Sequence, residues 1–163
     1  MGAGHGWQNS TMTVTSPRKS ITSVDSSALE TLVGYNTRRA SLVITEVFVE
    51  RMAVHDLRMV EFSILSLVGH NPGITSRQLS SALSILPPNL VSLVNGIDKR
   101  GLVERQPHPV DGRAVGLHLT SAGETLLAEA EHTAAQLEME STASLSAAER
   151  KTLIRLLQKI YRA

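Results

Sequence analysis

The sequence predicts a mainly α-helical protein that carries one small β-hairpin. Three observations support this fold class. Apolar residues recur at three- and four-residue spacing through most of the chain. Residues 75–100 read as two short helices joined by a turn, and residues 103–120 read as two short strands around a loop. Two helices followed by such a hairpin, or wing, form a winged helix-turn-helix, a shape that fits duplex DNA.

Composition limits the classes of function. The 163 residues suffice for one domain with helical extensions, and only 3% are aromatic, so the core must be aliphatic. The absence of cysteine excludes disulfides, thiolate metal sites and cysteine nucleophiles. The net charge of +1 gives little general support for nucleic-acid binding, which must therefore rest on local charge.

Residues 1–25 are rich in Ser, Thr and Gly and lack the apolar stretch of a signal peptide, so we expect a flexible tail ahead of a single domain at 26–163. No apolar run reaches the roughly 20 residues that a membrane span needs. A cytoplasmic protein without membrane partners is expected.

The first part of the domain should hold two helices. Residues 26–52 are expected to form one long helix, with Asp25 or Ser26 as its N-cap. His55-Asp56 is a break. A second helix is expected over about 57–70, where Asn71-Pro72-Gly73 gives a strong turn signal.

The helix-turn-helix begins after this turn. Ile74 is expected to add a very short strand to the later hairpin. Thr75 and Gln78 have the spacing of a capping box, which predicts a third helix from there to about Ser84. Leu79 should face the core.

The fourth helix and the wing follow. Pro87-Pro88 suits the first turn of a helix, where the N–H that proline lacks would have no partner. Gly101 suits a left-handed residue at the helix end. The wing strands are expected over 103–109 and 114–120.

Two further helices are expected at the C-terminal end. Thr120 or Ser121 should cap a helix that runs to about 141, and Ser146 with Glu149 predicts the start of another. The former is rich in Glu without Lys or Arg, and the latter is mostly basic. The two can pair within or between subunits, or they can simply be solvated faces.

The fourth helix has the polar face expected of a DNA-reading helix. Asn89, Ser92, Asn95 and Lys99 are spaced by three, three and four residues, which puts them on one side. Asn89 is the first choice for a base contact, because an amide can pair bidentately with adenine, although Asn89 could merely cap the helix. Pro88 could touch a thymine methyl group.

Two other places offer phosphate or groove contacts. Ser76, Arg77 and Gln78, at the start of the third helix, could bind phosphate through backbone N–H groups and the guanidinium, unless Arg77 is only a solvated charge. Arg113 in the wing loop could enter a narrow minor groove, held by Asp111. The alternative is an Asp–Arg pair that only fixes the turn.

From Gly34 onward the chain resembles the MarR family of winged-helix transcription regulators. The residues that carry the resemblance are the segment Gly34-Tyr35-Asn36-Thr37-Arg38-Arg39-Ala40-Ser41, Leu79–Ala82, Lys99–Arg105, Asp111-x-Arg113, and Leu119-Thr120-x-x-Gly123. The resemblance implies a homodimer held by helices at 26–52 and 121–163. Each subunit would place the winged part, 57–120, on one half of a near-palindromic operator. Many such regulators are repressors that small aromatic or phenolic ligands release.

The resemblance also implies a ligand site between the dimerisation helices and the winged part. The polar residues there would be Tyr35, Arg38, Arg39, His55 and Arg58. Arginine beside apolar walls suits an aromatic carboxylate. Alternatively, Arg38 and Arg39 lie on a solvated face or pair with Glu at the dimer interface.

Other functions have little support. No two of the six histidines have the spacing of a helical metal pair, so no metal and no cofactor is expected. We find no phosphate loop, nucleophile elbow or paired catalytic carboxylates, so no enzyme is expected. One alternative is a dimeric protein-interaction module of this fold with weakened or lost DNA binding. Ser92, Gly96 and Gly112 motivate it, because relatives often carry basic residues there.

Overall fold

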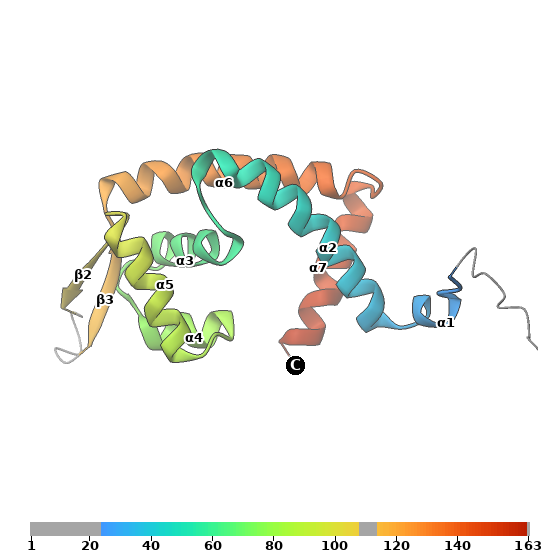
Figure 1. The fold of residues 1–163 in the computed structure, drawn as a ribbon, viewed down its shortest axis with the longest axis horizontal. Helices are drawn as coiled ribbons and strands as arrows, with labels where there is room; N and C mark the ends of the chain where they lie inside the picture. The colour runs from blue at the N-terminus through green and yellow to red at the C-terminus, as the bar shows by residue number, and fades with distance from the viewer. Residues whose placement is uncertain (1–23, 108–113, 163) are drawn as a thin grey trace, which may run out of the picture. The chain divides into compact units, whose positions relative to one another are not determined.

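The computed structural model describes residues 24–107 and 114–162. The chain divides into two compact units, with the boundary between Asn36 and Thr37. The first unit contains α1 (Ser27–Glu30) and the first residues of α2 (Val33–Met52). The second contains the remainder of α2 and all later elements (Figure 1).

The expected single helix over 26–52 is wrong at Thr31-Leu32, where the chain leaves the helical path between α1 and α2. The cause is local. The side-chain amide of Asn36 donates to the carbonyls of Glu30 and Leu32, each at 2.8 Å, which stabilises the turn. Ser26 occupies the N-cap position of α1.

The expected break at His55-Asp56 is confirmed. A short 3-10 helix, η1 (Ala53–His55), follows α2, and Asp56 adopts the left-handed conformation with φ 49°. α3 (Met59–His70) then runs to the turn at Asn71-Pro72-Gly73. It begins two residues later than expected.

The helix-turn-helix and the wing have the predicted order. β1 (Ile74–Thr75) leads into α4 (Ser76–Leu83), which is followed by α5 (Pro87–Lys99). The wing strands are β2 (Val103–Pro107) and β3 (Val115–Leu119). The sheet is antiparallel in the order β1-β3-β2, with Ile74 opposite Leu117 and Val103 opposite Leu119.

The strand–helix junctions at the base of the wing are joined by hydrogen bonds. Thr120 caps α6 (Ser121–Ser141) by accepting from the N–H of Gly123 at 3.1 Å. The same hydroxyl donates to the carbonyl of Gly101 at 2.7 Å, and the Thr120 N–H donates to Leu102. Gly101 has φ 68°, as its predicted left-handed role requires. The hydrogen bonds from Thr120 to Gly101 and Leu102 therefore join the start of α6 to the end of α5.

The core of the second unit lies where α3, α4, α5, α6 and the sheet meet. Its fully buried large side chains are aliphatic or sulfur-containing, as the low aromatic content requires. They are Met52, Ile64, Leu65, Val68, Leu79, Leu90, Val94, Ile97 and Leu117.

The acidic face of α6 pairs with α2 and α3. Glu140 accepts two hydrogen bonds from Arg51 of α2, at 2.7 and 2.9 Å, and Glu131 lies 2.8 Å from His70 of α3. α7 (Ala147–Tyr161) begins with the predicted capping box of Ser146 and Glu149. Among the residues that the structure describes, no ion pair joins α6 to α7, so pairing within the subunit takes other partners than expected.

Candidate nucleic-acid interface

The two faces of α5 differ as predicted. Leu90, Val94 and Ile97 are buried in the core, while Pro88 and the polar set are exposed. The exposed polar residues are Asn89, Ser92, Asn95 and Lys99. A helix anchored by one apolar face in this way presents the other face rigidly to a ligand.

Asn89 does not cap α5. The N-cap residue is Leu86, whose carbonyl accepts the backbone N–H of Asn89 at 3.0 Å. Asn89 lies in the first turn with an exposed side chain. The alternative that Asn89 merely caps the helix is therefore wrong.

Arg105 of β2 joins the wing to the polar face of α5, a contact that sequence reasoning missed. Its guanidinium donates to Oδ1 of Asn95 at 2.6 Å and to Oδ2 of Asp98 at 3.0 Å. Arg105 lies seven residues after Asp98 and ten residues after Asn95 in the sequence, beyond the end of α5 and within β2. Only the fold brings them together, so no local sequence pattern would have found the pair.

The start of α4 forms the predicted capping box. Thr75 accepts the Gln78 N–H at 3.3 Å, and the Gln78 side-chain carbonyl accepts the Thr75 N–H at 2.8 Å. The side-chain oxygen of Gln78 thus already accepts a hydrogen bond within the capping box. Arg77 is exposed beside it and Ser76 is half-buried. Both line a shallow hollow between α4 and α5, together with Ser80, Ser81, Pro87, Leu90 and Val91.

Asp111 and Arg113 lie outside the described residues, between β2 and β3. Their proposed role in the wing remains a prediction from the sequence.

The five residues expected to bind a ligand lie in different parts of the chain. Tyr35 is half-buried in the first unit, and the other four residues belong to the second. Arg38 and Arg39 are exposed on α2. A rise of about 1.5 Å per residue places Arg38 about 21 Å along the helix from Met52, where α2 ends. His55 and Arg58 lie beyond that end.

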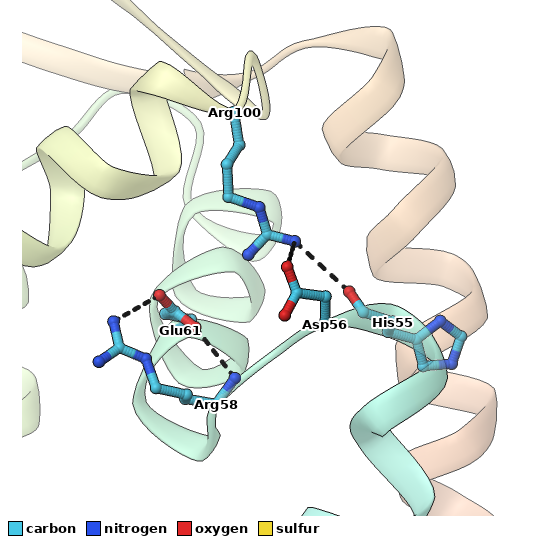
Figure 2. A network of polar contacts seen from close by, with 5 residues as sticks. All are labelled: His55, Asp56, Arg58, Glu61 and Arg100. Atoms are coloured by element: carbon cyan, nitrogen blue, oxygen red, sulfur yellow. Dashed lines mark hydrogen bonds and ion pairs between the residues drawn. The ribbon is translucent and has the colours of Figure 1, made fainter.

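His55 and Arg58 are part of a polar network between α2, α3 and α5 (Figure 2). The side chain of Arg100, at the end of α5, donates to the His55 carbonyl at 3.4 Å and lies 3.7 Å from the Asp56 carboxylate. The His55 ring contacts the hydroxyl of Thr133 on α6 at 2.9 Å. The junction after α2 is therefore connected both to the end of α5 and to α6.

Glu61 provides the ionic cap of α3 in this network. Its carboxylate accepts the Arg58 N–H at 3.0 Å and the Arg58 guanidinium at 2.6 Å, and the Glu61 side chain is only 9% exposed. The hydrogen bond from the Arg58 side chain is the main cause that lowers the pKa of Glu61 below its ordinary 4.5, with smaller help from the Arg58 backbone and Arg100; partial burial opposes the shift.

Glu61→Gln is expected to destabilise the protein by about 1 kcal/mol at neutral pH, because the amide keeps an acceptor for the Arg58 N–H but loses the charge. A carboxyl whose folded pKa is lowered stabilises the fold above its unfolded pKa, and this contribution disappears as the pH falls through the folded pKa. Urea unfolding at several pH values should show the two proteins converging below pH 4.5. A difference that stays constant with pH would contradict the ionic role.

A separate hollow of about 290 Å³ lies between α3, β3 and α6, and its polar lining residues are His70, His118, Glu124 and Glu131. Within the ranges that the structure describes, no group of three or more His, Asp or Glu side chains is arranged to hold a metal ion. His5 and His108 lie outside those ranges. Among the described helices, none is long and apolar enough to cross a membrane.

Residues 55–114 match the model of the MarR family. A putative transcriptional regulatory protein for the hcr operon of Thauera aromatica is 35% identical over 101 residues, which cover 62% of this chain and 61% of that protein. The chain thus spans about three-fifths of the length of this relative. A transcriptional repressor of Mycobacterium tuberculosis strain H37Rv is 24% identical over 128 residues, covering 78% of this chain and 92% of the repressor.

Solved structures confirm the predicted fold class. The repressor CouR, solved with a 23-mer DNA duplex, superposes with a TM-score of 0.80 at 33% identity, covering 85% of this chain and 99% of that one. Wild-type MarR from E. coli superposes with a TM-score of 0.68 at 26% identity, covering 79% and 96% of the two chains. The relatives are transcription regulators, which confirms the expectation that the protein is not an enzyme. The chain belongs to the MarR family of transcription regulators.

Proposed function

We propose that the protein is a homodimeric repressor that binds a near-palindromic operator in duplex DNA and is released by a small ligand. The single observation that carries the proposal is the exposed polar face of α5, anchored in the core and joined to the wing by Arg105. CouR, a relative of the same fold, was solved bound to DNA. A role on DNA also supports residence in the cytoplasm.

The proposed division of labour follows the resemblance. The winged part, 57–120, contacts DNA, and the helices at 26–52 and 121–163 hold the dimer. Asn89, Ser92, Asn95 and Lys99, with Pro88, face the major groove. Ser76, Arg77 and Gln78 contact phosphate, where the capping box fixes the first turn of α4. Asp111 and Arg113 contact DNA from the wing.

The apolar surface of α7 supports the dimer. None of the residues in Ala147–Tyr161 is buried within the subunit. Leu153, Leu156 and Ile160 are 41%, 47% and 63% exposed. Their spacing of three and four residues puts them on one stripe. A helix of this length gains most of its stability from packing, so a second copy of the chain is the proposed cover for the stripe.

Selection of random duplex DNA by the purified protein, followed by sequencing, tests the proposal. A dimeric reader should enrich a near-palindrome whose half-sites are about ten base pairs apart, because that spacing brings both major grooves to one side of the duplex. A folded dimer that enriches no sequence at low salt would overturn the proposal. The interaction module would then be the better explanation.

Arg113→Ala is expected to lower affinity for every operator variant and to make binding less sensitive to salt. The variant makes one contact fewer with a phosphate or groove, so fewer counterions are released when it binds DNA. Fluorescence anisotropy between 50 and 200 mM salt measures both effects. Unchanged affinity for Arg113→Ala would contradict a DNA role for the wing.

We further propose that the effector is an aromatic acid or its coenzyme A conjugate, bound through Tyr35, Arg38, Arg39, His55 and Arg58. CouR was also solved with p-coumaroyl-CoA. The distance of about 21 Å between Arg38 and the end of α2 exceeds the length of a salicylate-like acid. A coenzyme A conjugate is much longer, and its phosphates suit the exposed arginines of α2.

The junction after α2 supports a route from ligand to DNA. His55 and Arg100 connect this junction to α6 and to the end of α5, so a ligand that moves it also biases the reading helix. A ligand can shift the equilibrium only by its difference in affinity between the two states. A panel of aromatic acids, their coenzyme A conjugates and free coenzyme A should therefore contain a compound that weakens operator binding. A panel in which no compound binds the protein or alters its DNA affinity would refute the effector class.

A further inference from the structure

The amide of Asn95 has a fixed orientation on the DNA-reading face. A guanidinium carries only donors, so the atom of Asn95 that lies 2.6 Å from Arg105 must be the carbonyl oxygen Oδ1. Asp98 holds the same guanidinium by its Nε at 3.0 Å, which keeps it over α5. The amide is thus not free to exchange its oxygen and nitrogen, and its NH₂ group is the part left for another partner.

The charge beside Asn95 reinforces this orientation. A base that donates a hydrogen bond to Oδ1 would approach an oxygen that already accepts from a cation, and would be repelled by that cation. A base edge that carries acceptors is attracted both by the NH₂ group and by the guanidinium. Asn95 is exposed, and the side chains of Asp98 and Arg105 are each 40% exposed, so a ligand can reach the cluster.

We propose that Arg105 is a specificity-determining residue that makes Asn95 a hydrogen-bond donor to the DNA, with a preference for guanine. In the major groove guanine presents two neighbouring acceptors, N7 and O6, whereas adenine presents N7 beside the donating N6 group. An unconstrained asparagine favours adenine because it can use both its oxygen and its nitrogen. The inference rests on the proposed function, since it describes how the DNA-reading face chooses a base.

The test repeats the DNA selection with variants and compares base preferences position by position. Asn95→Ala identifies the base pair that residue 95 reads, as the one position in each half-site where preference is lost. The wild type should enrich guanine there. Arg105→Met removes the donors, so the guanine-to-adenine affinity ratio at that position should fall roughly tenfold or more.

Arg105→Lys provides a variant that keeps the charge on β2 but lacks the fork that reaches both Asn95 and Asp98. It should shift the preference in the same direction even if Arg105→Met fails to fold. Arg77→Gln is the matched control, because it removes a positive charge from the proposed phosphate contact at the start of α4 without touching the pair. It should weaken binding to all sequences equally and leave base preferences unchanged.

The outcomes separate the inference from the proposed function. An enriched palindrome whose base preferences are the same for the wild type and both Arg105 variants would overturn the inference alone. A uniform loss of affinity in the Arg105 variants, with preferences retained, would also overturn it and would identify Arg105 as a phosphate contact. Adenine at the Asn95 position in the wild type would contradict the donor role. No enrichment by the wild type would overturn both.

Discussion

Gly123→Ala is expected to destabilise the protein by about 3 kcal/mol, at the upper end of the range for overpacking a core. Gly123 is buried in the first turn of α6. A Cβ atom placed there would overlap the carbonyl oxygen of Leu102 and lie 3.0 Å from its carbonyl carbon. This oxygen cannot retreat easily, because it also accepts the N–H of Thr120 and lies at the base of the wing.

Thermal unfolding at a fixed protein concentration measures the effect, since a dimer's melting temperature depends on concentration. A loss of about 3 kcal/mol corresponds to a fall of roughly 6–12 °C for a chain of this size. Gly96→Ala is the matched control. A Cβ at Gly96 meets no atom within 4 Å, and alanine in the interior of α5 should stabilise the helix by up to about 1 kcal/mol. Equal melting temperatures for Gly123→Ala and the wild type would contradict the close approach of α6 to Leu102.

Features that depend on a few neighbouring residues were predictable. The capping boxes of Thr75 with Gln78 and of Ser146 with Glu149 appear where their spacing indicated. Gly101 has the left-handed conformation that ends α5. These signals act within one helical turn, so tertiary packing seldom overrides them.

Two other features were not predictable from spacing or apolar periodicity. The break at Thr31-Leu32 depends on hydrogen bonds from Asn36, which the apolar periodicity does not encode. Thr120, rather than Ser121, caps α6, because its hydroxyl also reaches the carbonyl of Gly101. Spacing alone allowed either residue.

The candidate site divides in the same way. The polar face of α5 follows from helical periodicity and is exposed as expected. Arg105 could not be recognised, because its two partners lie on another element and are reached only after the chain reverses into β2. Asp98, which looks like a plain surface charge in the sequence, is one of those partners.

Leu156→Glu is expected to convert the dimer to a monomer and to lower operator affinity by about a hundredfold or more. Leu156 is 47% exposed at the centre of the stripe formed with Leu153 and Ile160 on α7. A carboxylate there would lose its hydration against the apolar surface of the partner subunit. The free-energy cost of this desolvation is far larger than the free energy that burial of the leucine contributes. A monomer binds each half-site alone and loses the gain from linking the two.

Sedimentation velocity measures the oligomeric state, and anisotropy with full and half operators measures the loss of linkage. Ala148→Glu adds the same charge at an exposed position in the first turn of α7, where an acidic residue is favourable, and should leave the dimer intact. Circular dichroism distinguishes a folded monomer from an unfolded chain, and the milder Leu156→Ala should weaken the dimer without adding charge. If Leu156→Glu remains a dimer that binds the full operator normally, α7 does not form the dimer interface. Another surface of the chain must then contact the partner subunit.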